Sequence, residues 1–416
     1  MTAEVAIINH QGIALAADSA VTIGRKRVWK HANKLFSAGP RNDIGVMIFN
    51  SGDFLGITWE VIIKKHRRKR AIATFDTVEL FAQDLIEYLS SSDLANDMQE
   101  KTSIHLICID ILENLKEKIR CDTRKNFYAE LPRAVDSELE GLDHAEFLSG
   151  SESSADFIKK FKSSIKSFSK EIFGFLPKKE ILSKIYDLVY KHVTHQSESE
   201  YSTGVVIAGY GRDEFFPCVY NYVVDGRWKA LTRVWKTDRS VNLNEPNPVA
   251  AGIFPFTQSD MAMLFVEGIY PRYKVYLGEA LGGILNEKSK KLIENYLPEA
   301  ERVVEYERQV KDNNLIVEEL YKDFDDYRKK SFVSPLMATV AALPKEEMAF
   351  MAKAMVELTA LRRKFTSNVE SVGGAVDVAL ISKGDGFIWI DRKHYFDIDF
   401  NSDFRDRKAL SRGGAE

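Results

Sequence analysis

The stretch GIALAADSAVTIG, residues 12–24, places a single charge, Asp18, at the end of an apolar run that predicts a buried strand. The run AEVAII, residues 3–8, has the same character, and the NHQG between the two runs predicts a tight turn. Because the strands of a hairpin are antiparallel, their open ends lie side by side. We therefore expect Thr2, at the start of the first strand, to lie beside Asp18.

Composition restricts the class of protein. The chain has 416 residues, of which 45% are hydrophobic and 29% are charged, as is typical of a globular protein with a large core. The formal net charge of −3 gives no general attraction to nucleic acid or to an anionic membrane. No apolar run reaches the length of a membrane span, and the first residues lack the pattern of a signal peptide. We therefore expect a cytoplasmic protein without a membrane segment.

The cysteine and histidine content argues against disulfide and metal chemistry. Three cysteines, Cys108, Cys121 and Cys218, are too few for a disulfide framework and favour a reducing compartment. His192 and His195 are three residues apart on a predicted helix, but no cysteine or acidic cluster accompanies them. We expect no metal ion and no cofactor.

Strand-like and helical patterns alternate along the chain. Short β-branched, alternating runs fill the first 50 residues. Further strand patterns occur at 203–210, 217–224, 228–235, 375–382 and 386–393, with the Asp-Gly pair at 225–226 as a turn. Helical periodicity covers 53–70, 75–89, 259–268 and 344–365. The long remaining segments are helical and rich in polar residues.

Without these long helical segments, the order of elements fits two stacked sheets that are covered by helices on both sides. We therefore expect an α+β fold, a four-layer αββα sandwich, in one domain that spans residues 1–416. The expected parts are core segments 2–92, 200–270 and 335–398, helical insertions 93–199 and 271–334, and a polar tail 399–416.

Several of these motifs resemble those of proteasome β-type subunits, whose mature chain begins with a catalytic threonine. Residues 12–24 are similar to the family's run of glycine, apolar strand, Ala-Asp-Ser, threonine and glycine. NKLF (33–36) and FNSGDF (49–54) match its Lys-Leu-Phe segment and its glycine-containing turn. SNVESVGGAVDVALI (367–381) is closest to the bacterial proteasome-like group called Anbu. The resemblance covers residues 2–70, 203–268 and 344–393 and leaves out the two helical insertions.

The spacing of three polar residues is the most specific part of this resemblance. Thr2 precedes Asp18 by 16 residues and Lys34 by 32, and both intervals equal those of the family. The resemblance implies an N-terminal nucleophile hydrolase in which Thr2 attacks and Asp18 orients Lys34 against it. A threonine hydroxyl is a weak nucleophile, and the α-amine freed by removal of Met1, with a pKa of about 7.7–8, suits the role of base. The alternative to this catalytic interpretation is that Asp18 is only a turn residue and Lys34 only a surface lysine.

An oxyanion intermediate also needs a backbone N–H donor. The turn NSGD, residues 50–53, offers the N–H groups of Ser51 and Gly52. The alternative is that this glycine serves only the turn.

Supporting residues are implied by the resemblance alone. Ser371 matches a supporting serine of the family, but Asn368, three residues earlier, replaces the family's acid. A second supporting serine should lie just before the predicted helix at 259–268, where no Gly-Ser-Gly occurs. Thr257 and Ser259 are the two candidates at that place.

The resemblance also implies a substrate site. A peptide would lie as an added strand beside Ala20-Val21-Thr22, paired to Val21 and Thr22. The pocket residues carried over from the family are Val21, Ala32 and Phe36. They are apolar, which predicts an apolar or small side chain before the cleaved bond.

The sequence thus predicts a proteasome-like threonine endopeptidase that cleaves polypeptides and forms a homo-oligomer. One alternative is a hydrolase of small amides with the same fold. Another is a catalytically silent scaffold whose helical insertions bind a regulatory protein partner. The basic run KKHRRKR, residues 64–70, complements the C-terminal end of a helix dipole, so we do not expect nucleic-acid binding.

Overall fold

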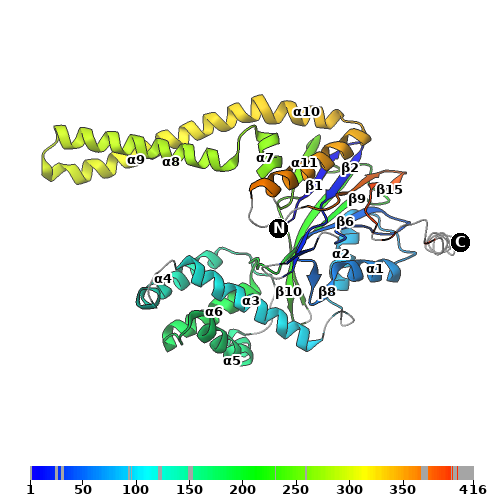
Figure 1. Ribbon diagram of the computed structural model, residues 1–416, viewed down its shortest axis with the longest axis horizontal. Coiled ribbons are helices and arrows are strands. Elements are labelled where there is room, and N and C mark those ends of the chain that lie inside the picture. The colour runs from blue at the N-terminus through cyan, green and yellow to red at the C-terminus, as the bar shows by residue number, and fades with distance from the viewer. Residues whose placement is uncertain are drawn as a thin grey trace.

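The computed structural model describes residues 2–23, 27–29, 32–91, 94, 96–119, 124–148, 153–229, 231–257, 260–366, 373–394, 396 and 401. The chain is a mixed α+β protein built on antiparallel sheets (Figure 1). The predicted N-terminal hairpin is present, since β1 (Glu4–Asn9) pairs with β2 (Gly12–Ala17) in the register that sets Glu4 opposite Ala17.

The first sheet brings the N-terminal hairpin together with strands from the C-terminal part of the chain. All residues of β1 and β2 are buried, because other strands flank them and both faces of the sheet are covered. The strand order is β13 (Ala251–Pro255), β1, β2, β14 (Asp377–Ser382) and β15 (Gly386–Asp391).

The second sheet lies over the first. Its strand order is β11 (Leu231–Lys236), β10 (Cys218–Trp228), β9 (Thr203–Tyr210), β6 (Asp43–Asn50) and β5 (Leu35–Ser37), and β12 (Val241–Asn242) pairs with β10. Two short ribbons pair β3 (Val21–Ile23) with β4 (Arg27–Trp29) and β7 (Asp53–Phe54) with β8 (Ile57–Thr58).

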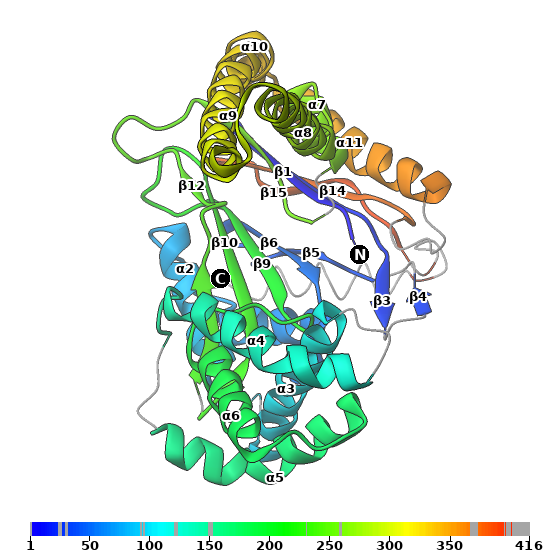
Figure 2. The same ribbon diagram turned by 90° about the vertical axis from the view of Figure 1, so that its left-hand side faces the viewer.

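The two sheets face each other across a shared apolar core (Figure 2). Ile8 and Leu15 of the first sheet and Met47 of the second belong to this core, and all three are fully buried. Gly45 allows a close approach of the sheets, because a Cβ at this position would lie 2.8 Å from Cδ1 of Ile381. Side chains alternate between the two faces along β1, and those of Ala6 and Ile8 lie in this core. The side chain of Glu4, on the same face, therefore also points between the sheets.

Helices cover the outer face of each sheet. The first sheet packs against α11 (Lys345–Thr366), α7 (Asp260–Glu267) and α10 (Ser334–Ala342). The second packs against α1 (Trp59–Lys69) and α2 (Val78–Leu89), with the Trp59 ring fully buried.

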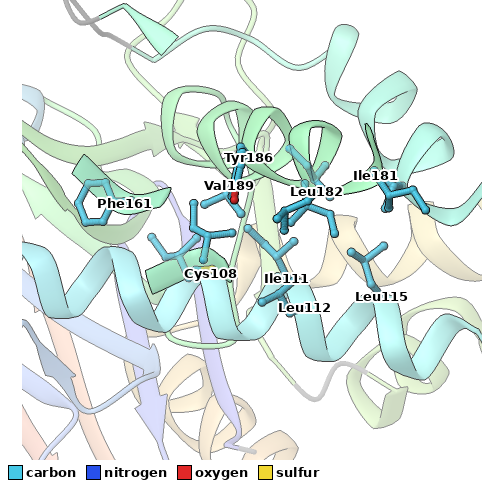
Figure 3. Packing of buried hydrophobic residues seen from close by; sticks show 14 of the residues in the cluster. Cys108, Ile111, Leu112, Leu115, Phe161, Ile181, Leu182, Tyr186 and Val189 are labelled. Carbon is cyan, nitrogen blue, oxygen red and sulfur yellow. The ribbon is translucent and has the colours of Figure 1, made fainter. Parts of the chain in front are cut away.

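The helical segment between α2 and β9, predicted as the first insertion, packs around a hydrophobic core that Trp228 of β10 joins. Cys108, Leu112 and Leu115 of one helix face Leu182 and Val189 of another in this core (Figure 3). The insertion consists of α3 (Asp97–Lys118), α4 (Arg124–Asp143), α5 (Ser154–Phe173) and α6 (Lys179–Thr194). Below the sheets in Figure 1, it forms a separate helical lobe beside the end of β10.

The second insertion is a long helical hairpin that extends away from the sheets (Figure 1). It consists of α8 (Pro271–Tyr296) and α9 (Glu299–Arg328), and a π-helical turn, η1 (Lys329–Val333), leads into α10. The seam between the two helices contains small and polar contacts. Gly278 packs against the ring of Tyr321, and Asn313 donates a hydrogen bond of 2.8 Å to Asn286.

Two local predictions were wrong, and one strand was not predicted. The helix predicted from residue 53 begins at Trp59, because Leu55 and Gly56 take positive φ angles of 54° and 77° in the turn between β7 and β8. Asp225-Gly226 is a bulge inside β10 rather than a turn, with Gly226 at a φ of 78°. Residues 251–255, for which no strand was predicted, form β13 at the edge of the first sheet.

Candidate active site

Thr2, Asp18 and Lys34 lie at the same end of the stacked sheets. Thr2 precedes β1, Asp18 follows β2 and Lys34 precedes β5, and each of the three residues is at most 2% exposed. The hairpin brings the first two chain segments together. The Asp18 N–H donates to the Ala3 carbonyl oxygen at 3.1 Å, and the Ala3 N–H donates to the Asp18 carboxylate at 3.2 Å.

The Lys34 ammonium lies between two carboxylates. Its Nζ is 2.5 Å from Oδ1 of Asp18 and 3.0 Å from Oε1 of Glu4. The second oxygen of Asp18 accepts a hydrogen bond of 2.9 Å from the Gly373 N–H. Asp18 is thus fixed by the backbone on two sides and in turn fixes Lys34.

Glu4 lies between this lysine and Thr2, and the sequence interpretation did not identify it. Its Oε2 is 3.1 Å from the Thr2 hydroxyl and 2.7 Å from the hydroxyl of Thr257. The Thr257 hydroxyl also lies 2.5 Å from the carbonyl oxygen of Thr2. We use the term nucleophile cluster for Thr2, Glu4, Asp18 and Lys34. Within it, Glu4 connects the hydroxyl to the ammonium.

The nucleophile cluster is electrostatically unbalanced. Two buried carboxylates, those of Glu4 and Asp18, share the single Lys34 ammonium. Burial raises the pKa of the Glu4 carboxyl, and the charge of Asp18 adds to the rise, whereas Lys34 acts in the opposite direction. A carboxyl with a raised pKa is suited to bind and release a proton within the site.

Part of the expected oxyanion turn is occupied by structural hydrogen bonds. The Ser51 N–H donates to the Ser202 carbonyl oxygen at 3.2 Å, and the Ser51 side chain bonds to Asp53. The Gly52 carbonyl oxygen accepts a hydrogen bond of 3.1 Å from the Trp59 N–H, which closes the β7–β8 ribbon. Ser51 therefore uses its N–H within the fold, and Gly52 is the remaining candidate donor.

The expected substrate residues lie in different surroundings. Phe36 is buried in the core between the second sheet and α1, so its ring packs within the fold. Ala32 is half-buried, and its N–H donates to the Ser19 carbonyl oxygen at 3.0 Å. Val21 and Thr22 belong to β3, which pairs with β4, and their side chains lie outside the described residues.

The supporting residues are only partly described. Asn368, Ser371 and Ser259 lie outside the described residues. Of the two candidates for the second supporting position, Thr257 is placed in direct contact with Glu4 and Thr2. The strand β13 brings it there from a distant part of the chain, by pairing with β1.

The basic run at 64–70 is partly paired with carboxylates within the fold. His66 is buried and its Nε2 lies 2.8 Å from Asp84, which also binds the Arg70 guanidinium at 2.5 Å. Lys64 pairs with Glu60. Burial lowers the pKa of His66, which favours its neutral form. These contacts support the structural interpretation of this helix end.

Within the described residues, no set of three or more His, Cys, Asp and Glu side chains is arranged to hold a metal ion. A search of the same residues finds no helix with the length and apolar character needed to cross a membrane.

Comparison with known proteins gives only remote similarity. No protein-family model and no curated protein matches the chain. Among solved structures, it is similar to Anbu (ancestral beta-subunit) from Yersinia bercovieri, with 9% identity, a TM-score of 0.29, and coverage of 98% of this chain and 95% of that one. It is also similar to the helical assembly of the Anbu complex from Pseudomonas aeruginosa, with 10% identity, a TM-score of 0.27, and coverage of 98% and 94%. These TM-scores are too low to support a conclusion about function.

Proposed function

We propose that this protein is a threonine-type N-terminal nucleophile hydrolase that cleaves peptide bonds, with Thr2 as the nucleophile after removal of Met1. The observation that carries the proposal is the buried nucleophile cluster, in which the Thr2 hydroxyl is connected through Glu4 to a lysine–aspartate pair. A hydroxyl, a titratable carboxyl and an ammonium in contact are the parts that activation of a weak nucleophile needs.

In this proposal, Oγ of Thr2 attacks the carbonyl carbon of the scissile amide. Lys34 stabilises the negative charge that develops near the nucleophile, and Asp18 holds the lysine in place. The Gly52 N–H is the proposed donor to the oxyanion. The α-amine of Thr2, once Met1 is removed, is available to carry a proton to or from the reacting groups.

We propose that the two sheets and their covering helices form the four-layer αββα sandwich of proteasome-like hydrolases. The apolar core between the sheets and the helices on both outer faces support this assignment. The helical segments 93–199 and 271–334 are then insertions in one domain. The three cysteines in 416 residues support a cytoplasmic location.

The proposed substrate is a polypeptide that pairs with β3. A hydrolase of small amides is the related alternative, which differs in turning over a small amide but not an unstructured polypeptide. A catalytically silent scaffold is favoured by one observation, namely that Thr2 is only 1% exposed. The experiment below separates these candidates.

We also propose that the chain forms a homo-oligomer through the α8–α9 hairpin. Large apolar side chains are exposed along both helices, including Ile284 at 65% and Val304 at 72%. Ion pairs such as Lys274–Asp325 already join α8 to α9 within one hairpin, so the exposed apolar side chains are the surface proposed to meet a second copy. Sedimentation of the wild type and of an Ile284→Glu/Val304→Glu variant tests this, since we expect only the wild type to self-associate.

Turnover of fluorogenic peptides, small amides and casein by protein of verified intact mass tests the function. We expect peptide hydrolysis by chains that lack Met1, reduced but measurable hydrolysis by Thr2→Ser, and none by Thr2→Ala. Thr2→Ala removes only the hydroxyl and a methyl group, so it should leave the fold intact. Full activity of Thr2→Ala, or an inert wild type that lacks Met1, would refute the proposal.

A further inference from the structure

We propose that Glu4 is a catalytic residue that accepts the hydroxyl proton of Thr2 as the nucleophile attacks. This inference rests on the proposed function and names a group that the sequence resemblance does not include. It changes the expected arrangement, in which Lys34 would lie directly against the nucleophile and the α-amine alone would serve as base.

The distances within the cluster indicate which group accepts the hydroxyl proton of Thr2. Oε2 of Glu4 is 3.1 Å from Oγ of Thr2, within the distance at which a general base acts. Lys34 contacts the opposite oxygen, Oε1, and an ammonium has no lone pair to take a proton. The carboxylate of Asp18 is already bonded by Lys34 and by the N–H groups of Ala3 and Gly373. Glu4 is therefore the carboxylate that faces the hydroxyl.

Strand geometry fixes this contact. Thr2 precedes β1, and the contact of its hydroxyl with Oε2 of Glu4 puts the two side chains on the same side of the chain. Pairing of Glu4 with Ala17 fixes the backbone of Glu4 beside the chain segment that carries Asp18. The proximity thus depends on buried backbone pairing rather than on a flexible loop.

The proposed step conserves atoms and charge. Oγ of Thr2 forms a bond to the carbonyl carbon while its proton moves to Oε2 of Glu4 and the carbonyl π electrons move to the oxyanion. When the tetrahedral intermediate collapses, the C–N bond breaks and the protonated Glu4 gives its proton to the leaving amine. Water then attacks the ester, with Glu4 taking a proton from the water and returning it to Oγ as the ester bond breaks.

The groups around Glu4 suit this proton transfer. Lys34 and Asp18 face it from the segments before β5 and after β2, and Thr257 faces it from the segment after β13. Burial and Asp18 raise the pKa of Glu4, which brings the carboxyl nearer to the working pH of a general base. Lys34 keeps the ionised form accessible.

The test measures the rate at which a peptide β-lactone acylates Thr2, with the modified residue identified by mass spectrometry, between pH 5 and pH 9. Wild type is compared with Glu4→Gln, which keeps the size of the side chain but removes its basicity. Glu214→Gln is the matched control, since Glu214 is also a buried glutamate but lies after β9, outside the nucleophile cluster.

We expect Glu4→Gln to slow acylation by about 10²–10⁴-fold, the usual range for loss of general base catalysis, and to remove the acidic limb of the pH–rate profile. Glu214→Gln should stay within about threefold of wild type and keep that limb, because the nucleophile cluster remains intact. Glu4→Asp should show intermediate rates with the limb preserved.

Acylation of Glu4→Gln within about threefold of wild type, with an unchanged pH profile, would overturn the role of Glu4 while leaving Thr2 as nucleophile. If Glu4→Gln fails to fold by circular dichroism, Glu4→Ala decides, since it also lacks the carboxylate: a rate within about threefold of wild type with the acidic limb retained would likewise overturn it. A wild type that is never acylated at Thr2 refutes the proposed function itself and this role with it.

Discussion

Two buried ionic clusters in this molecule contain similar side chains but differ in charge balance. The nucleophile cluster has two carboxylates for one ammonium and a hydroxyl at its end. The second, which we term the anchor cluster, consists of Ser199, Asp225 and Arg233 and has one carboxylate for one guanidinium.

The hydrogen bonds of the anchor cluster join α6 and the segment after it to the second sheet. The Arg233 guanidinium donates to Asp225 at 2.8 Å and to the carbonyl oxygens of His192, Val193 and Ser197 at 2.6–2.9 Å. Both carboxylate oxygens of Asp225 accept further bonds from Ser199, at 2.7 Å and 3.0 Å.

The difference in charge balance between the two clusters indicates a structural role for one and a chemical role for the other. A balanced pair in which every polar atom is bonded has no proton to exchange, so its contribution is to hold segments together. A cluster with an extra carboxylate must take up a proton or a further positive charge, and a hydroxyl at its end can supply or receive that proton. Each prediction below tests this contrast.

The largest expected effect is on stability, from the anchor cluster. Arg233→Met leaves the buried Asp225 without its cation, and we expect it to lower the free energy of unfolding by about 3–5 kcal/mol. Urea denaturation measures this value. Arg212→Met is the control, since Arg212 is an exposed ion-pair residue and its loss should cost about 1 kcal/mol or less.

The same Arg233→Met protein, if folded at low temperature, should acylate at Thr2 at the wild-type rate. A large loss of acylation with little loss of stability would reverse the assignment of the two clusters.

The next effect is on reactivity. Lys34→Ala should reduce Thr2 acylation by about 10²-fold, the loss typical of one preorganised electrostatic group. Lys34→Arg should restore little activity, because a planar guanidinium does not fit the place of a compact ammonium between two carboxylates. Single-turnover kinetics measures both, and an active Lys34→Arg would show that charge alone suffices.

A double-mutant cycle tests whether Asp18 acts through Lys34. Asp18→Asn should reduce acylation by about tenfold or more, and the combination with Lys34→Ala should be far less impaired than the product of the single losses. Additive losses in free energy would show that the 2.5 Å contact between the two residues has no role in reactivity.

The smallest expected effect is a pH dependence of stability. The pKa of Glu4 is raised in the folded chain, so the folded state binds its proton more tightly than the unfolded state does. Stability of the wild type relative to Glu4→Gln should therefore fall as the pH rises from about 4, the ordinary value for glutamate, through the raised pKa. Thermal melts of both proteins at several pH values measure the difference, and parallel curves would contradict it.

Regular hairpins could be predicted from the sequence because their patterns are local. The β1–β2 hairpin follows from two apolar runs and a short turn, and α11 follows from a long periodic segment that begins next to Pro344. The strand β13 could not be predicted in this way. It is short, follows a proline-rich loop, and is fixed by pairing with β1, from which it is distant in sequence.

The same distinction applies to the site. Fixed intervals from Thr2 indicated Asp18 and Lys34, which the structure brings into contact. Glu4 was not identified from the sequence because charged residues are common at the ends of apolar strands, so its presence there gave no specific signal. The available signal was its position two residues after Thr2, which in an extended chain puts both side chains on the same side. Thr257 required the tertiary structure, since β13 determines its position.

The most direct test of the central claim is to find which hydroxyl of the site reacts with an electrophile. Thr2 and Thr257 both contact Oε2 of Glu4, so the two hydroxyls can be compared within one site. Treatment of the wild type, freed of Met1, with a peptide β-lactone and peptide mapping by mass spectrometry identifies the modified residue. We predict a single adduct on Thr2 that is absent in Thr2→Ala. An adduct on Thr257, or none on Thr2, would contradict this account of the site.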